Sequence, residues 1–139
     1  MKILEAATKD AYTSCFEVMK ELRPHHSLDS FLTAMDKMKK EGYQLHYLED
    51  NGKVVCVAGF RFTTTLYDGL IIDFDDFVTS TEARGKGYAG LLFEHLVSIA
   101  KERSIKTIHL NSNHKRFDAH RFYLNKKMNI VAHHFRVEL

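Results

Sequence analysis

The sequence has only two cysteines and one proline in 139 residues. Cys15 and Cys56 are far apart and form neither a CxxC motif nor a zinc-ligand spacing, so no metal site is predicted. Cys56 lies in an apolar, strand-like run, which indicates a buried and reduced thiol. Two pairs of adjacent histidines do not favour chelation either, because neighbours on a strand point to opposite faces. These pairs are His25-His26 and His133-His134.

The chain also lacks a long apolar run, a targeting segment and a basic cluster. No stretch approaches the roughly 18 apolar residues that cross a bilayer, and the N-terminal "MKILEAATKD" has no apolar signal-peptide core. The net charge is +2 and dense basic runs are absent, which does not suit a nucleic-acid surface. We therefore expect a cytoplasmic protein that binds neither membranes nor nucleic acids.

What is present is the composition of an ordinary globular protein, with 45% hydrophobic and 27% charged residues. There is no repeat, no low-complexity segment and no linker rich in glycine, serine and proline. The sequence therefore predicts a single domain over residues 1–139. The only proline, Pro24, predicts the end of a first helix.

The spacing of apolar residues changes along the chain from a helical period to a period of two. The first half is predicted to contain a strand at 2–6, helices at 9–22 and 28–41, and strands at 43–49 and 53–63 around a turn at 50–52. The second half is predicted to contain a strand at 69–79, a helix ending near 103, a strand at 105–112, a helix at 116–126 and a strand at 129–139. Thr8 and either Ser27 or Asp29 are the expected N-caps of the first two helices. This order predicts a mixed α/β layered domain around one sheet.

The stretch "ARGKGYAG" at 83–90 lies where a strand ends and a helix begins. Glycines there allow a close backbone approach, and the first N–H groups of the helix favour an anion such as phosphate. One interpretation is a dinucleotide site, since Gly85, Gly87 and Gly90 fit GxGxxG. That interpretation would make the protein an oxidoreductase. A dinucleotide site also needs an acidic residue that binds a ribose hydroxyl at the tip of the next strand, and this strand has none. A P-loop motif is absent.

The run from Arg84 to Ala89 resembles the Q/R-x-x-G-x-G/A motif of the GNAT superfamily, the acyl-CoA-dependent N-acetyltransferases. The segment 75–102 resembles that family's fourth strand, pyrophosphate loop and third helix, and "HKRFDAHRFYLNKKM" resembles its later helix. The sequence departs from the family at Arg116, where many members have asparagine, and at Met128, where many have a Gly-Phe pair. The order of elements matches the family over essentially the whole chain.

The resemblance implies a GNAT-like fold, with a β-meander followed by α, β, α and β, helices on both faces, and strands that splay apart at a coenzyme A cleft. It implies acetyl-CoA as co-substrate, with backbone groups of the third meander strand pairing with pantetheine. An amide of that strand would polarise the thioester carbonyl. The implied cofactor-binding residues are Phe77, Val78, Thr79, Arg84, Gly85, Lys86, Gly87, Tyr88, Ala89, Gly90, Asn111, Arg116 and His120.

Acetyl transfer to an amine also needs an acid and a base. Tyr123 is the expected general acid, because a phenol with a pKa of about 10 can reprotonate a thiolate. Three acids occupy the 69–79 strand, and alternation places Asp73 and Asp75 on one face. We expect Asp75 or Asp76 to bind the amine or accept its proton, with Asp73 further out.

Together these features predict an N-acetyltransferase in which a primary amine attacks acetyl-CoA directly in a ternary complex. The alternative is a non-catalytic acyl-CoA-binding or regulatory domain on the same scaffold. Acids near the site suit a cationic acceptor such as a polyamine, an aminoglycoside or a lysine side chain. A homodimer is also possible through pairing of the last predicted strand with another subunit.

Overall fold

The computed structural model describes the whole chain, Met1–Leu139, which divides into two compact units, Met1–His109 and Leu110–Leu139. The first unit is built on a sheet with strand order β1-β2-β3-β4-β5. The strands are β1 (Lys2–Glu5), β2 (Gln44–Asp50), β3 (Lys53–Thr65), β4 (Gly69–Thr79) and the short β5 (Ile108–Leu110). The first four pair antiparallel. The predicted β-meander is therefore confirmed.

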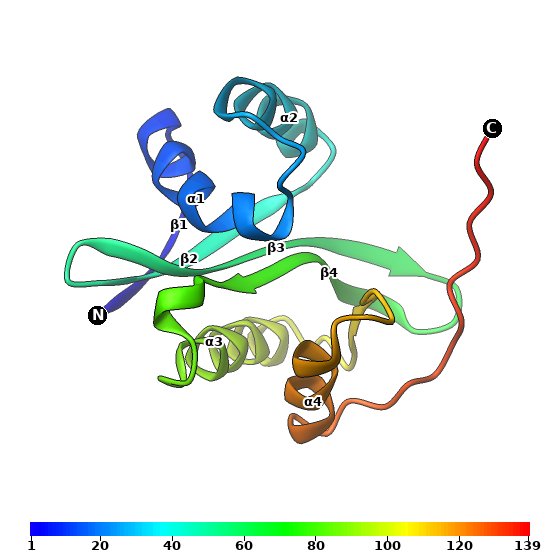
Figure 1. The fold of residues 1–139 in the computed structure, drawn as a ribbon. Coiled ribbons are helices and arrows are strands. Elements are labelled where there is room, and N and C mark those ends of the chain that lie inside the picture. Colours follow the sequence, from blue (N-terminus) through cyan, green and yellow to red (C-terminus); the bar gives the residue numbers. More distant parts are fainter. The chain divides into compact units, whose positions relative to one another are not determined.

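Helices cover both faces of this sheet (Figure 1). One face carries α1 (Lys9–Leu22) and α2 (Leu28–Lys40), and the other carries α3 (Tyr88–Glu102), which follows a short 3-10 turn, Thr81–Ala83. The first two helices begin where the sequence predicts, because Thr8 and Ser27 accept backbone N–H groups of their first turns. The mixed α/β architecture is confirmed.

Two apolar layers fill the space between sheet and helices. The layer under α1 and α2 contains Cys15, Met19, Phe31, Leu45, Val57 and Val78, among others. On the α3 side, Phe74 packs edge-on against Phe93 of α3, and Leu92 and Leu96 are fully buried. This sandwich fixes β4 between the two layers, with its buried side chains divided between them.

The second unit contains α4 (Phe117–Asn125) followed by an extended segment. The predicted strand at 129–139 is wrong for the chain as described, because no strand and no backbone hydrogen bond involves these residues. A strand pattern becomes a strand only when a neighbouring edge supplies hydrogen bonds. The predicted strand at 105–112 is likewise reduced to three residues. No helix combines the length and the apolar character that crossing a membrane requires.

A buried histidine beneath α3 makes the stability of the first unit sensitive to acid. His46 of β2 is 8% exposed, and its Nδ1 lies 3.1 Å from Nε2 of His95 on α3. Its Nε2 is buried without a partner. Burial, and secondly the neighbouring His95, lowers the pKa of His46 to about 4.

We expect the free energy of unfolding to fall by up to about 2 kcal/mol between about pH 7 and pH 5 because of this histidine. The folded state resists protonation of His46 while the unfolded chain accepts it near its ordinary pKa. This contribution to stability is thus present above the pKa of histidine in the unfolded chain. It is lost as the pH falls from that pKa toward 4. Urea unfolding at the two pH values measures the change. A His46→Asn variant should flatten the dependence, whereas the exposed His25→Asn should leave it intact, and equal slopes in all three proteins would contradict the prediction.

Candidate active site

The glycine-rich turn forms a backbone cradle at the start of α3. Gly85 and Gly87 have positive φ angles of 76° and 83°, and Gly87 occupies the N-cap position in a left-handed conformation. No side chain caps the helix, and the first helical hydrogen bond runs from Leu91 N–H to Gly87 C=O. The preceding amides therefore have no acceptor within the helix, which is the arrangement that binds phosphate oxygens.

Side chains around this turn hold it in place. The Nε of Arg84 donates to the Thr79 carbonyl at 3.3 Å, and its guanidinium lies 3.9 Å from the Glu21 carboxylate. Glu21 also accepts from the backbone N–H and the hydroxyl of Thr81, both at 2.9 Å. On the other side, Tyr88 donates to Asp50 at 2.6 Å, and this hydrogen bond raises the pKa of the Tyr88 phenol. The turn is thus tied both to α1 and to the β2–β3 hairpin.

The strand that leads into the turn is only partly flanked by β5. β4 has 11 residues and β5 has three, and their contact includes a hydrogen bond from Ile72 N–H to the Thr107 carbonyl at 3.4 Å. That contact lies in the first half of β4. The second half, which includes Phe77–Thr79, pairs with β3 through Ala58, Val57 and Cys56. An extended ligand can therefore approach this half of β4 from its other edge.

A β-bulge at Asp75 changes the direction of the side chains along β4. Gly59 of β3 is opposite Asp76, and the next residue, Phe60, is opposite Phe74, so Asp75 is an extra residue in the ladder. Phe74 and Phe77 consequently stack on each other, with ring centroids 5.5 Å apart. Asp76 turns instead toward the α1 and α2 side, as its contacts show. Simple alternation predicts Asp75 and Asp76 on opposite faces, and the bulge overrides it.

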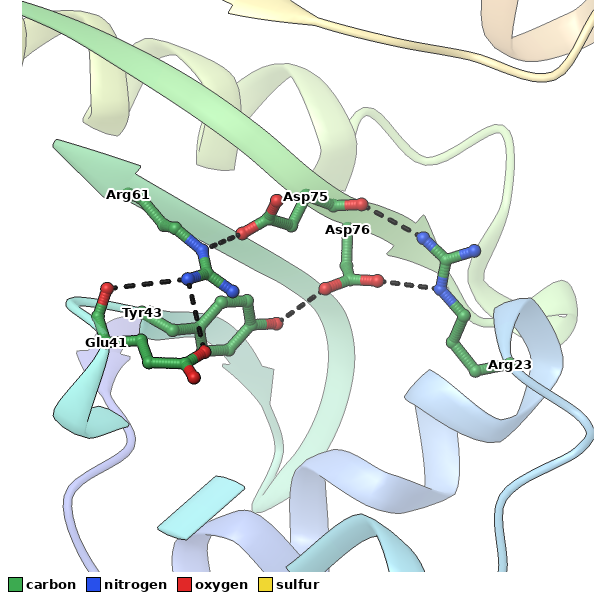
Figure 2. A network of polar contacts seen from close by, with 6 residues as sticks. All are labelled: Arg23, Glu41, Tyr43, Arg61, Asp75 and Asp76. Carbon is green, nitrogen blue, oxygen red and sulfur yellow. Dashed lines mark hydrogen bonds and ion pairs between the residues drawn. The ribbon is translucent and has the colours of Figure 1, made fainter. Parts of the chain in front are cut away.

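Asp76 is held at the centre of a polar network (Figure 2). It is 9% exposed, and its two oxygens accept from Nε of Arg23 at 2.8 Å and from the Tyr43 hydroxyl at 2.7 Å. Arg23 also donates to the backbone carbonyl of Asp75 at 3.0 Å. Burial, and then the nearby Asp76 carboxylate, raises the pKa of Tyr43 well above its ordinary value. Both oxygens of the buried carboxylate therefore accept hydrogen bonds from side chains of the protein.

Asp75 has a more open environment than Asp76. Its Oδ2 accepts from Nε of Arg61 at 2.8 Å, and its side chain is 35% exposed. Arg61 also donates a hydrogen bond through Nη1 to the backbone carbonyl of Glu41 at 3.4 Å (Figure 2). Asp73 is opposite Arg61 in the β3–β4 ladder, and burial, followed by the nearby Asp75 charge, raises the pKa of Asp73. Arg61 thus binds Asp75 and is the cross-strand partner of Asp73, which agrees with the predicted shared face of these two acids.

The sequence matches the acetyltransferase (GNAT) family over residues 6–128. The chain belongs to the GNAT family. The match runs through the cradle, the bulged strand and α4, so it covers every segment on which the predicted site depends. The resemblance proposed from the motif at Arg84–Ala89 is thereby confirmed.

Individual relatives support the same family and fold. The chain is 27% identical over 123 residues to the uncharacterized N-acetyltransferase YhdJ of Bacillus subtilis, covering 88% of this chain and 87% of that protein. Among solved structures, a transcriptional regulator from Bacillus halodurans superposes with a TM-score of 0.86 at 23% identity, over 99% of both chains. The ribosomal-protein-alanine N-acetyltransferase of Brucella melitensis superposes with a TM-score of 0.83 at 16% identity, over 100% of both chains. At these identities the structural likeness shows the GNAT fold.

Four of the predicted GNAT site residues lie in the second unit. Asn111 follows β5, and Arg116 is the N-cap residue of α4. His120 contacts the Asn113 carbonyl through Nε2 at 2.8 Å, which fixes its ring within this unit. Tyr123 lies on α4 and is 8% exposed. Their part in binding or catalysis stays a prediction.

The sequence analysis missed the residues that hold the bulge. Arg23 ends α1, Tyr43 precedes β2 and Gly59 lies inside β3, so they are dispersed along the chain. One signal was present, because a glycine inside a strand marks a place where another group approaches the backbone closely. Here that group is the Tyr43 ring, which occupies the space of a Cβ on Gly59.

Proposed function

We propose that the protein transfers an acetyl group from acetyl-CoA to a primary amine by direct attack in a ternary complex. The observation that carries the proposal is the uncapped start of α3, preceded by two left-handed glycines and by a β4 edge that β5 only partly flanks. A diphosphate and an extended thiol arm need this pair of features. Membership of the GNAT family supports the proposal.

Each part of the chain has a task in this proposal. The amides of residues 85–90, with Arg84 and Lys86, bind the pyrophosphate. The backbone of Phe77–Thr79 aligns pantetheine, and the N–H of Phe77 or Val78 donates to the thioester oxygen as negative charge develops there. As the C–N bond forms and the C–S bond breaks, Tyr123 gives its proton to the thiolate. Asn111, Arg116 and His120 complete the proposed coenzyme A contacts.

At the amine end, the contacts favour Asp75 over Asp76. Asp76 is buried and both its oxygens are occupied by Arg23 and Tyr43. Asp75 is more exposed and uses one oxygen for Arg61. We therefore assign Asp75 to binding the ammonium form and accepting its proton through water, and Asp76 to holding the bulge.

The state of the two thiols supports direct attack. Cys15 and Cys56 are fully buried, and burial raises the pKa of each thiol to about 12. The Thr79 hydroxyl donates to the Cys56 sulfur at 3.2 Å. Because the thiolate is the nucleophilic form, neither cysteine is prepared to carry an acetyl group.

The direct test is release of free thiol from acetyl-CoA in the presence of a panel of amines. The panel contains polyamines, aminoglycosides, lysine peptides and neutral aromatic amines. We expect turnover with at least one cationic class, because Asp75 favours a positive charge. Turnover with neutral amines alone would remove Asp75 from the proposal, and no turnover with any class would leave the binding alternative.

The cradle itself can be tested with Gly87→Ala. Alanine at this positive φ is strained by about 1–2 kcal/mol, so the turn should shift and acetyl-CoA should bind about tenfold more weakly. Isothermal titration calorimetry measures the dissociation constant. Gly42→Ala is the matched control, since Gly42 also has a positive φ, 91°, and open space around it, but follows α2. Gly42→Ala should lose similar stability and bind normally, and unchanged binding by Gly87→Ala would count against the cradle.

The alternative is a non-catalytic acyl-CoA-binding domain with a regulatory role. It is favoured by the likeness to the Bacillus halodurans structure named as a transcriptional regulator. In that case, calorimetry detects acetyl-CoA binding, while the thiol assay detects no release of free thiol with any amine.

A further inference from the structure

The last turn of α1 places a carboxylate beside the turn that is proposed to bind the diphosphate. Oε2 of Glu21 accepts hydrogen bonds from the backbone N–H and the hydroxyl of Thr81, both at 2.9 Å, and it lies 3.9 Å from Nη2 of Arg84. Thr81 and Arg84 both belong to the segment that joins β4 to α3. A negative charge at this position opposes the binding of an anion at the same turn.

The hydrogen bonds with Thr81 do not require that charge. A neutral amide oxygen also accepts hydrogen bonds from an N–H and a hydroxyl. The charge of Glu21 acts instead on Arg84, since 3.9 Å is too long for a hydrogen bond and leaves an electrostatic attraction. The side chains of Glu21 and Arg84 are 30% and 60% exposed, so water weakens this attraction. A ligand with a higher negative charge can therefore replace Glu21 as the partner of Arg84.

Arg84 is held at the turn independently of Glu21. Its Nε donates to the Thr79 carbonyl at 3.3 Å, and its backbone N–H donates to the Thr81 carbonyl at 3.4 Å. The two Nη groups carry the remaining N–H donors of the guanidinium, a planar fork that suits phosphate oxygens. Arg84 thus stays beside the turn whichever anion its Nη groups face.

We propose that Glu21 competes with the diphosphate of acetyl-CoA for Arg84 and thereby limits the affinity of the coenzyme. This inference rests on the proposed function, which assigns the turn to that diphosphate. Without ligand, Glu21 neutralises Arg84 and anchors Thr81. When the diphosphate binds, the Nη groups of Arg84 turn to a phosphate oxygen, while Glu21 keeps its two hydrogen bonds with Thr81.

The competition affects substrate and product alike, because acetyl-CoA and CoA carry the same diphosphate. A coenzyme that binds less tightly dissociates sooner, so Glu21 favours the release of CoA after transfer. Glu21 is in this sense a determinant of coenzyme affinity that opposes binding, in contrast to the amides and cations of the turn.

The substitution Glu21→Gln tests the proposal, because it keeps an oxygen acceptor for Thr81 and removes the charge. Isothermal titration calorimetry should show acetyl-CoA binding about threefold to fivefold tighter than to the wild type, the upper range for an exposed ion pair. Glu102→Gln is the matched control, with the same change of charge at the last residue of α3. It lies about 20 Å along the helix from the turn, beyond the range of screened charges, and should bind like the wild type.

An Arg84→Gln background shows whether Glu21 acts through Arg84. Arg84→Gln alone should weaken the binding of acetyl-CoA, and adding Glu21→Gln should then give no gain, because the cation for which the two anions compete is absent. An equal gain in both backgrounds would mean that Glu21 repels the ligand directly, and it would overturn the competition.

Acetyl-CoA that lacks the 3′-phosphate identifies the phosphate group concerned. It keeps the diphosphate, so Glu21→Gln should tighten its binding by the same factor as for acetyl-CoA. A gain confined to the ligand with the 3′-phosphate would place Glu21 beside that group and overturn its assignment to the diphosphate.

Failure of this inference can be distinguished from failure of the proposed function. A wild type that binds acetyl-CoA, together with a Glu21→Gln variant that binds it equally or more weakly, would overturn the inference alone and leave Glu21 as an anchor of Thr81. A wild type that does not bind acetyl-CoA would overturn the proposed function and this inference with it.

Discussion

Replacing Tyr123 by phenylalanine is expected to lower kcat about 100-fold or more while the dissociation constant of acetyl-CoA stays the same. The physical reason is the loss of the proton that the departing thiolate needs, and general acid catalysis typically contributes at least this much. The substitution removes one oxygen and keeps the ring that is buried on α4. Steady-state thiol release gives kcat, and calorimetry gives the affinity.

Because Tyr123 is buried, a structural role has to be separated from a catalytic one. Thermal unfolding of Tyr123→Phe should stay close to that of the wild type if the loss of turnover is chemical. Tyr12→Phe, on α1, is a matched control that removes a phenol oxygen from a residue without an assigned role. A Tyr123→Phe enzyme with normal kcat would exclude Tyr123 as the acid, and the proton would have to come from another group or from water.

The second large effect is expected from Gly59→Ala, which should destabilise the protein by about 2–4 kcal/mol. A Cβ at Gly59 would overlap the hydroxyl and Cζ of Tyr43 and would lie 2.7 Å from its Cε2. Tyr43 would have to withdraw, and the buried Asp76 would lose one of its two donors. For a chain of this length, the midpoint of thermal unfolding should fall by about 10 °C.

A double-mutant cycle shows whether this steric conflict is the cause. In a Tyr43→Leu background the obstacle is gone, so Gly59→Ala should cost less than about 1 kcal/mol, and the two substitutions should be strongly non-additive. Additive effects would mean that Gly59 is required for another reason, such as the backbone of the bulge itself. Thermal or urea unfolding of the four proteins provides the comparison.

Features with local causes were predictable from the sequence. The starts of α1 and α2 follow from Thr8 and Ser27, whose side chains act within one turn. The β2–β3 hairpin follows from Asn51 and Gly52, which adopt the positive φ angles that the turn needs. The turn before α3 is equally local, which is why the motif at residues 84–89 was sufficient to indicate the family; the phosphate site there stays a prediction.

Features that depend on distant residues were not predictable. Strict alternation would place Asp76 on the face opposite Asp73 and Asp75, and alternation fails at a bulge that depends on pairing with β3. The partners of Asp76 lie 53 and 33 residues away, in Arg23 and Tyr43. The residue types alone do not indicate that a carboxylate in the middle of β4 is satisfied internally.

The extra residue at Asp75 has a consequence for how this strand can vary. Before the bulge, the even-numbered side chains of β4 point toward α3, and after it the odd-numbered ones do. The rings at 74 and 77 therefore meet on one side of the strand, while two consecutive acids share the other. Deleting a single residue there would exchange the two sides of everything that follows, carrying Phe77 toward Arg23 and Tyr43. No single substitution can return the side chains after the bulge to their original faces. The number of residues in this strand is therefore under tighter constraint than its composition.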